Sequence, residues 1–351
     1  MSRRIFELTL WMATVAGTLP ASAAPPIPWP PGLPVYDHVV VVIEENKDYD
    51  QINGSSAAPY LNVTLRKEGA NLTRMFGEEH NSQGNYFWLF SGDNQSVGYV
   101  DKVPHDLGGL PPFTTPNLGA SLLASGRTFK GYSEDLPQNG SRDEFGTNAK
   151  GKKSYARKHN PWVSFRYEPG NALATTSNLQ FADFPTKPAQ FATLPTVAFV
   201  VPGLKHDMHD GEPAKSIRRG DTWLKKHLDA YYQWAKTHNS LLIVTWDESD
   251  NQKVPDPAGG EPVEYHGPTN PGVEPTNQMN RNLQNRIPTI IAGARVKHGD
   301  FSEGKGVTHV NLLRTLEAMY GLPRAGKQLA TAEAYGIKDE YIITDVFEST
   351  P

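Results

Sequence analysis

The chain contains no cysteine among its 351 residues. Disulfide bonds, thiolate metal sites and cysteine nucleophiles are therefore all excluded. After the N-terminal segment, no apolar run approaches the roughly 20 residues that a membrane-spanning helix needs. The net charge is only −4, so the composition does not indicate a nucleic-acid partner. The length suits one large α/β domain or two small ones.

The first 23 residues have the features of a signal peptide. Ser2-Arg3-Arg4 provides a positive start, residues 5–19 are largely apolar, and Ala21-Ser22-Ala23 fits a small-x-small cleavage site. Residues 24–37 form a proline-rich lead, which we expect to be extended. We therefore expect a secreted or periplasmic protein without stable membrane insertion, whose single domain spans residues 38–351.

Short apolar runs and amphipathic helices alternate along this domain. The runs typical of buried strands are residues 38–43, 196–201, 241–245 and 286–292. The predicted helices are residues 58–67, 222–237 and 310–320. This alternation predicts an α/β fold with a mostly parallel sheet covered on both faces. Two polar regions rich in glycine, proline and asparagine, residues 100–157 and 251–284, are expected to be loops that build a rim or lid.

Oxygen-bearing side chains follow two of the predicted strands. Glu45 and Asn46 follow the first run, and Asp247 and Glu248 follow the third. Open α/β sheets place their chemistry just beyond the carboxyl ends of such strands. Carboxylate and amide oxygens suit calcium, magnesium or manganese better than zinc, so the four residues are candidate ligands of a divalent metal ion. A solvated strand end or a helix cap is the alternative for either pair.

Ser82 precedes an aromatic, apolar segment. A serine at the beginning of a helix presents its oxygen where backbone amides and the helix dipole favour an anion. Beside a metal ion its hydroxyl could ionise without a histidine base, which would make it a nucleophile. Asn85, one turn later, could donate its amide to a phosphoryl oxygen. A serine that only caps the helix is the alternative.

Histidines in three further segments are candidates for proton transfer, and aspartates lie beside them in one of these segments. Imidazoles near a phosphoryl group bind its oxygens or protonate a leaving alkoxide, and they can instead hold a second ion. Residues 206–210 follow a predicted strand, which places them at the same edge of the sheet as the metal candidates. The residues concerned are His159, His206, Asp207, His209, Asp210 and His309.

Taken together, these segments resemble the bacterial and fungal phosphoesterase family that joins acid phosphatases with phosphatidylcholine-type phospholipases C, in the alkaline-phosphatase-like superfamily. The matching pieces are HVVVVIEEN (38–46), NSQGNY (81–86), FSG (90–92), YARKHNP (155–161), DMHDG (207–211), TWDE (245–248) and THVNLLRTLE (308–317). They occur in the family's order. The chain departs at Gly84, where the family usually has proline, and at His80-Asn81, where it often reads His-Pro.

The resemblance implies a three-layer αβα sandwich with a central, mainly parallel sheet. It implies a divalent metal ion held by the four oxygen-bearing residues at the strand ends, a phosphorylated nucleophile at Ser82 and an oxyanion partner at Asn85. The histidines that match family motifs are His159, His209 and His309. His206, Asp207 and Asp210 are expected to contact a second ion or the phosphate.

We therefore expect a phosphoesterase domain that hydrolyses phosphate monoesters with broad specificity, through a phosphoserine. Its expected partners are small phosphoesters, including phospholipid head groups. The alternative is a phospholipase C or another phosphodiesterase, in which Phe87, Trp88, Phe113 and Trp162 would contact lipid; such aromatics more often pack in the core. A further alternative is a non-catalytic envelope protein that binds metal or glycan on the same scaffold.

Overall fold

The computed structural model describes residues 28–97, 101, 113–168, 171–172, 174–250, 253–254, 263–264, 285–302, 306–334 and 336–348. The predicted signal peptide, the start of the proline-rich lead and most of the predicted loop at 251–284 lie outside these residues. Among the described residues, no helix is both long and apolar enough to cross a membrane.

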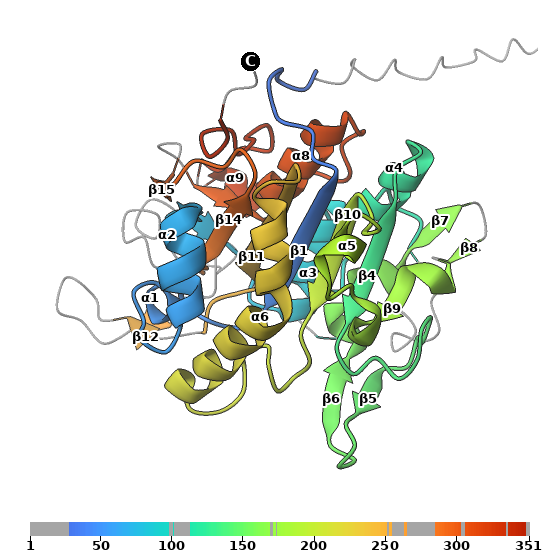
Figure 1. Ribbon diagram of the computed structural model, residues 1–351. Helices are drawn as coiled ribbons and strands as arrows, with labels where there is room; N and C mark the ends of the chain where they lie inside the picture. The colour runs from blue at the N-terminus through green and yellow to red at the C-terminus, as the bar shows by residue number, and fades with distance from the viewer. Residues whose placement is uncertain are drawn as a thin grey trace, which may run out of the picture.

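A central sheet runs through the molecule, with strand order β15-β2-β14-β11-β1-β10-β4-β9 (Figure 1). Its strands are β1 (His38–Glu44), β2 (Ala70–Leu72), β4 (Phe129–Ser133), β9 (Asn178–Gln180), β10 (Val197–Val201), β11 (Ser240–Trp246), β14 (Thr289–Gly293) and β15 (Gly299–Phe301). β1 pairs in parallel with β10 and with β11. β14 runs antiparallel to both of its neighbours. The predicted mostly parallel sheet is confirmed.

Helices cover both faces of this sheet (Figure 1). One face carries α1 (Tyr49–Ile52), a π-helical turn (Tyr60–Leu65), α2 (Arg66–Glu68), α5 (Pro188–Phe191) and α6 (Pro213–Ala235). The other face carries α3 (Ser82–Ser91), α4 (Leu118–Ala124) and α8 (His309–Tyr320), which pack against one another. The three-layer αβα arrangement expected from the resemblance is therefore present.

Short elements complete the described chain. They are α9 (Ala330–Ala334), the strands β3 (Met75–Phe76), β5 (Phe145–Thr147), β6 (Lys153–Ala156), β7 (Arg166–Glu168), β8 (Asn171–Ala172), β12 (Lys253–Val254), β13 (Val263–Glu264) and β16 (Val307–Thr308), and the 3-10 turns Arg157–His159, Pro161–Ser164, Thr175–Ser177 and Phe181–Asp183.

The expectation that residues 100–157 are loops is wrong. They include α4 and β4, and β4 is an internal strand that pairs in parallel with β10 and β9. Lys130 and Gly131 interrupt its apolar run, which hides the strand in the sequence. Gly131 is required by packing, because a Cβ at this position would overlap the Trp162 indole.

Helix α6 begins nine residues before the predicted start at Thr222. Glu212 caps it by accepting hydrogen bonds from the backbone N–H groups of Ala214 and Lys215, and Pro213 occupies the first helical position. Most of the side chains in the first two turns are exposed, so the apolar periodicity begins only later. The apolar pattern of the sequence therefore places the start of α6 too late.

Candidate active site

The pairing of β1 with β11 sets the position of the polar residues that follow them. Glu44 lies opposite Trp246 in the parallel register, so both chains leave the sheet at the same level. The Asp247 backbone N–H donates to the Glu44 carbonyl at 3.0 Å. The Glu45 backbone N–H donates to the Asp207 carbonyl at 2.8 Å, which adds the segment after β10. Three segments distant in sequence thus meet at one edge of the sheet.

Ser82 lies against two of the carboxylates at this edge. It is the first residue of α3, and its Oγ lies 3.2 Å from Glu248 Oε1 and 3.3 Å from Glu45 Oε2. All three side chains are buried. The helix N-terminus adds a positive potential at the hydroxyl. The arrangement can both accept the hydroxyl proton and hold an anion next to the serine oxygen.

Asn46 joins the two carboxylate-bearing loops. Its backbone N–H donates to Asp247 Oδ1 at 3.0 Å, and its side-chain Nδ2 donates to Glu248 Oε1 at 2.9 Å. Its φ of 20° lies at the border of the left-handed region, which asparagine tolerates better than most residues. The four predicted metal ligands are therefore in one cluster with Ser82.

Several acidic groups at this edge are held away from water. Burial raises the pKa of Asp247 well above its ordinary value, and the charges of Glu45 and Glu248 raise it further. Burial and the Glu45 charge likewise raise the pKa of Asp207. So many buried carboxylates cannot all be charged unless a cation compensates them.

The side-chain oxygens of the cluster are of the chemical type that binds a hard cation. Asn46 Oδ1, Asp207 Oδ2 and Asp247 Oδ2 are buried and accept no hydrogen bond from any described residue. Oxygen donors of this kind are the ligands of calcium, magnesium or manganese. Within the described ranges, however, no three His, Asp or Glu side chains are arranged as a ready-made metal site. The expected metal ion therefore remains a prediction.

His159 and Tyr86 hold the first carboxylate from the other side. His159 Nε2 lies 3.1 Å from Glu45 Oε1, and the Tyr86 hydroxyl donates to the same oxygen at 2.7 Å. The two rings stack, with centroids 5.2 Å apart. Burial lowers the pKa of His159 to about 4, although the Glu45 carboxylate partly opposes this effect. His159 is thus neutral near neutral pH, and its ring lies directly beside the Glu45 carboxylate.

Two residues that match family motifs are used inside the protein. Asn85 accepts hydrogen bonds from the backbone N–H groups of Glu78 and Glu79, and its Nδ2 donates to the Glu79 carbonyl. His309 lies between the Glu78 carboxylate, 2.7 Å from Nδ1, and the Trp246 carbonyl, 2.8 Å from Nε2. Both side chains support the backbone behind the site; both ring nitrogens of His309 are engaged, whereas the Asn85 amide nitrogen has a second N–H besides the one that binds Glu79.

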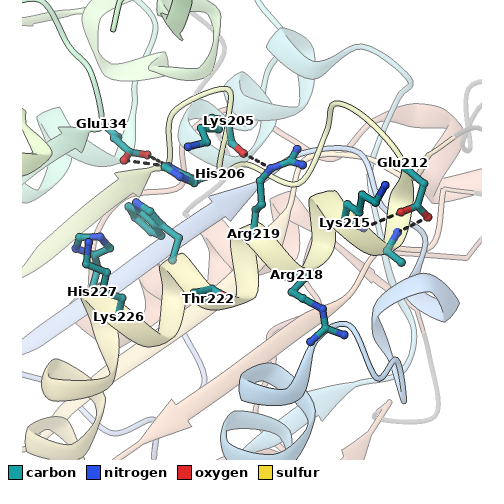
Figure 2. A pocket seen from close by; sticks show the side chains of 12 residues that line it. Glu134, Lys205, His206, Glu212, Lys215, Arg218, Arg219, Thr222, Lys226 and His227 are labelled. Atoms are coloured by element: carbon teal, nitrogen blue, oxygen red, sulfur yellow. Dashed lines mark hydrogen bonds and ion pairs between the residues drawn. The ribbon is translucent and has the colours of Figure 1, made fainter. Parts of the chain in front are cut away.

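The segment after β10 divides into two parts. Asp207 and His209 face the cluster: the His209 backbone N–H donates to Asp207 Oδ1, and the charge of His209 contributes to the low pKa of His159. Asp210 is largely exposed and holds His209 Nδ1 at 2.8 Å. His206 instead pairs with Glu134 at 2.9 Å and lies in a separate groove along α6 (Figure 2).

Comparison with known proteins agrees with this geometry. The sequence profile of the Phosphoesterase family matches residues 55–323, which is most of the chain. The chain belongs to the Phosphoesterase family. It is therefore a phosphoric ester hydrolase, as expected from the sequence.

The relatives of this phosphoesterase include named phosphatases. It is 38% identical over 327 residues to a phosphatidylinositol-3-phosphatase of Mycobacterium tuberculosis, covering 92% of this chain and 91% of the relative. It is 24% identical over 298 residues to a phosphate-repressible acid phosphatase of Penicillium chrysogenum, covering 83% of this chain and 61% of the relative.

Solved structures show the same fold at low identity. A Vibrio parahaemolyticus protein of the alkaline phosphatase superfamily superposes with a TM-score of 0.51 at 12% identity, over 90% of this chain and 74% of that one. A lipoteichoic acid synthase from Listeria monocytogenes gives the same TM-score and identity, over 88% of this chain and 79% of that one. The alkaline-phosphatase-like fold is confirmed.

The phosphoesterase site also includes residues that sequence reasoning missed. His80 Nδ1 lies 2.9 Å from Glu248 Oε2, and Tyr86 binds Glu45 as described. His80 and Tyr86 lie close to Ser82 in the sequence, and this proximity is the one sequence feature that could have indicated their place in the site. Lys158, beside His159, carries a positive charge toward Glu45, and its ammonium lies 2.5 Å from Asp101 Oδ2.

Lys47 is a buried cation at this edge. Its ammonium donates to the Asn46 carbonyl at 2.5 Å and lies 3.4 Å from both the His209 carbonyl and Asp250 Oδ2. It therefore ties together the loops after β1, β10 and β11. Nothing in its sequence position distinguishes it from a surface lysine.

The departure at Gly84 has a structural reason. A Cβ at this position would overlap the carboxylate of Glu79, which accepts a hydrogen bond from the Trp88 indole at 2.8 Å. Glycine thus lets Glu79 lie directly against α3, in place of the proline that the family usually has.

Proposed function

We propose that this phosphoesterase hydrolyses phosphate monoesters and that its substrate class is the monoester phosphate of a phosphoinositide head group. The observation that carries the proposal is the Ser82 hydroxyl, held within hydrogen-bond distance of Glu45 and Glu248 at a helix N-terminus. The relative that shares 38% identity over 92% of the chain is a phosphatidylinositol-3-phosphatase, and further relatives are acid phosphatases. These names support a monoester substrate.

We also propose that catalysis depends on a divalent metal ion. Glu45, Asn46, Asp247 and Glu248 would hold it, since their oxygens are clustered and two of them, Asn46 Oδ1 and Asp247 Oδ2, are buried without a donor in the described structure. When bound, the ion would supply positive charge to the phosphoryl oxygens and to the serine oxygen. The oxygen donors favour calcium, magnesium or manganese.

Ser82 is the proposed nucleophile. Its oxygen attacks phosphorus opposite the leaving oxygen, the P–O bond to the leaving group breaks, and a phosphoserine forms. Glu248 Oε1, 3.2 Å from Ser82 Oγ, is placed to accept the hydroxyl proton. A water molecule then attacks the phosphoserine, which releases phosphate and restores the serine.

His209 is the proposed proton donor to the leaving oxygen. His159 is neutral near neutral pH because burial lowers its pKa to about 4, and both ring nitrogens of His309 are engaged. His209 has its Nδ1 held by Asp210, and its side chain is half exposed. This leaves Nε2 to deliver a proton, with the aspartate fixing the tautomer.

No observation favours the phospholipase C alternative. Most of the aromatic residues that would contact lipid in that case are in the core: Trp162 covers Gly131 and is fully buried, and Phe87 is buried and packs edge to face with the partly buried Phe113. Trp88 is also buried and binds Glu79. The binding-protein alternative is likewise not supported, because the family consists of hydrolases.

Export remains part of the proposal. The basic start, the apolar stretch and the small-residue site within residues 1–23 support removal of a signal peptide and delivery to the periplasm or the outside.

The test compares substrates and one variant. Purified protein should hydrolyse short-chain phosphatidylinositol 3-phosphate and p-nitrophenyl phosphate much faster than bis(p-nitrophenyl) phosphate. Ser82→Ala should lower kcat on both monoesters by about a thousandfold or more. Ser91→Ala is the matched control, because Ser91 lies at the other end of the same helix and its hydroxyl bonds only to Phe87, Asp93 and Gln95. Faster turnover of the diester, or full activity of Ser82→Ala, would refute the proposal.

A further inference from the structure

A basic groove runs along α6 (Figure 2). Its volume is about 1010 Å³. Besides Ala214, Thr222, Trp223 and two histidines, it is lined by five cationic and two acidic side chains: Lys205, Lys215, Arg218, Arg219, Lys226, Glu134 and Glu212. We call this surface the α6 groove. Its excess of positive charge contrasts with the net charge of −4 for the whole chain.

The two acidic residues of the α6 groove are engaged with other groups. Glu134 binds His206 Nδ1 at 2.9 Å and accepts from the Gly203 backbone N–H at 2.8 Å. Glu212 caps α6 through the backbone N–H groups of its first turn. In the part of the chain that the structure describes, neither carboxylate forms an ion pair with a lysine of the groove.

Three lysines of the groove have free ammonium groups. Lys205, Lys215 and Lys226 are exposed, and none forms a side-chain hydrogen bond or ion pair with the part of the chain that the structure describes. Lys215 and Lys226 are separated by eleven residues of one helix, which is roughly 16 Å along its axis. A single phosphate cannot contact both ends of such a row, whereas an extended anionic surface can.

The groove is linked to the catalytic edge. Arg219 donates to the carbonyls of Lys205 and Asp210, at 3.1 and 2.7 Å, so it holds both ends of the segment that carries Asp207 and His209. Gly220 lets this segment lie directly on α6, because a Cβ there would overlap Met208. The groove and the site therefore share one loop and lie at neighbouring parts of the same edge.

We propose that the α6 groove docks the enzyme on a membrane surface rich in anionic phospholipids. Ammonium groups spread along a helix on aliphatic stems match a layer of lipid phosphates. The inference deepens the proposed function, on which it rests, because a phosphoinositide substrate lies in such a surface. Docking brings the loop with His209 close to the lipid head groups.

The experiment measures co-sedimentation of the full chain with vesicles that contain no phosphoinositide. One set is phosphatidylcholine alone, and the other is equal parts of phosphatidylcholine and phosphatidylserine. The groove variant is Lys205→Gln, Lys215→Gln and Lys226→Gln together. The control variant is Lys150→Gln, Lys152→Gln and Lys187→Gln, which removes the same charge from exposed positions outside the groove.

The wild type and the control variant should bind the mixed vesicles and not pure phosphatidylcholine. The groove variant should lose affinity on the order of 100-fold, since each lysine near an anionic surface contributes a few-fold or more. All three proteins should hydrolyse p-nitrophenyl phosphate equally. Equal losses in the two variants, or no binding of wild type to the mixed vesicles, would overturn the inference.

Further outcomes separate the inference from the proposed function. Tight binding of inositol hexakisphosphate or single-stranded DNA through the same lysines, without vesicle binding, would assign the groove to a soluble polyanion and overturn membrane docking. Vesicle binding that depends on the groove, in a protein that hydrolyses no monoester, would support docking and refute the proposed reaction.

Discussion

Ser82 Oγ and Glu248 Oε1 lie 3.2 Å apart, although 166 residues separate them in the chain. Two buried parallel strands produce this approach: β1 and β11 end at the same level, and α3 presents its first residue to them. The hydroxyl thus has a proton acceptor, a helix N-terminus and unpaired carboxylate oxygens around it.

Removal of the proposed metal ion should abolish turnover. Asp247→Asn keeps the oxygen that accepts from the Asn46 N–H but loses the charge of the buried Oδ2. We expect kcat to fall on the order of 100-fold or more, as metal-ion catalysis supplies several kcal/mol. A chelator should do the same to the wild type, and added calcium, magnesium or manganese should raise the melting temperature of the wild type alone.

Asp300→Asn is the control for this variant, because Asp300 is an exposed carboxylate paired with Arg66. Full turnover of chelator-treated wild type together with full turnover of Asp247→Asn would reject metal dependence.

His159 should position Glu45 and should not transfer a proton. Its pKa of about 4, set by burial, leaves the ring neutral between about pH 5 and 8. His159→Gln keeps a neutral polar side chain beside Glu45, so it should keep the shape of the pH profile of kcat/KM and lose little activity. His159→Ala should lose more, without a change in shape. Disappearance of a limb of the profile in His159→Gln would show that this ring does titrate in catalysis.

His209→Gln should act selectively on substrates with poor leaving groups. An alkyl phosphate needs a proton on its leaving oxygen, and loss of a general acid costs roughly 10²–10⁴-fold. p-Nitrophenolate leaves without a proton, so turnover of p-nitrophenyl phosphate should change far less. His238→Gln is the matched control, since His238 lies beyond the end of α6 and binds Trp234. Equal losses on both substrates would assign the proton to another group.

The stability of the fold should fall with rising pH through Glu317. Burial raises the pKa of this residue to about 7 from 4.5, although Arg314 opposes the shift. The folded state holds this proton more tightly than the unfolded state does. The contribution of Glu317 to the free energy of unfolding is therefore complete below about pH 4.5 and is lost as the pH rises to about 7. The difference is about 3 kcal/mol.

Unfolding by urea at several pH values measures this slope, with Glu317→Gln as the reference that cannot titrate. The free energy of unfolding of the wild type should fall relative to the variant between about pH 5 and 7. Parallel curves for the two proteins would contradict the assignment.

The central strands and the carboxylate cluster could be predicted because a fully buried strand has a continuous run of apolar residues in the sequence. The runs at β1, β10 and β11 are of this kind, and the polar residues after them must then share one edge. β4 could not be recognised in the same way. Its Gly131 is required because the Trp162 indole packs against it. This contact joins parts of the chain that are distant in sequence, so no local pattern reveals it.

For the histidines, spacing in the sequence is not enough to predict where each side chain lies. His206 and His209 are three residues apart, yet Met208 between them has a φ of 71°, and the turned backbone sends the two rings to different surfaces. His309 and Asn85 match family motifs, but their hydrogen bonds to Glu78 and its neighbours depend on tertiary packing. Their use as internal supports is visible only in three dimensions.

Trapping of the covalent intermediate tests the central claim most directly. Protein mixed with p-nitrophenyl phosphate is quenched in acid during turnover, and the peptide that contains Ser82 is analysed by mass spectrometry. We predict one phosphoryl group on Ser82 in the wild type and none in Ser82→Ala. Continued hydrolysis by Ser82→Ala, with no phosphate on Ser82 of the wild type, would contradict the account.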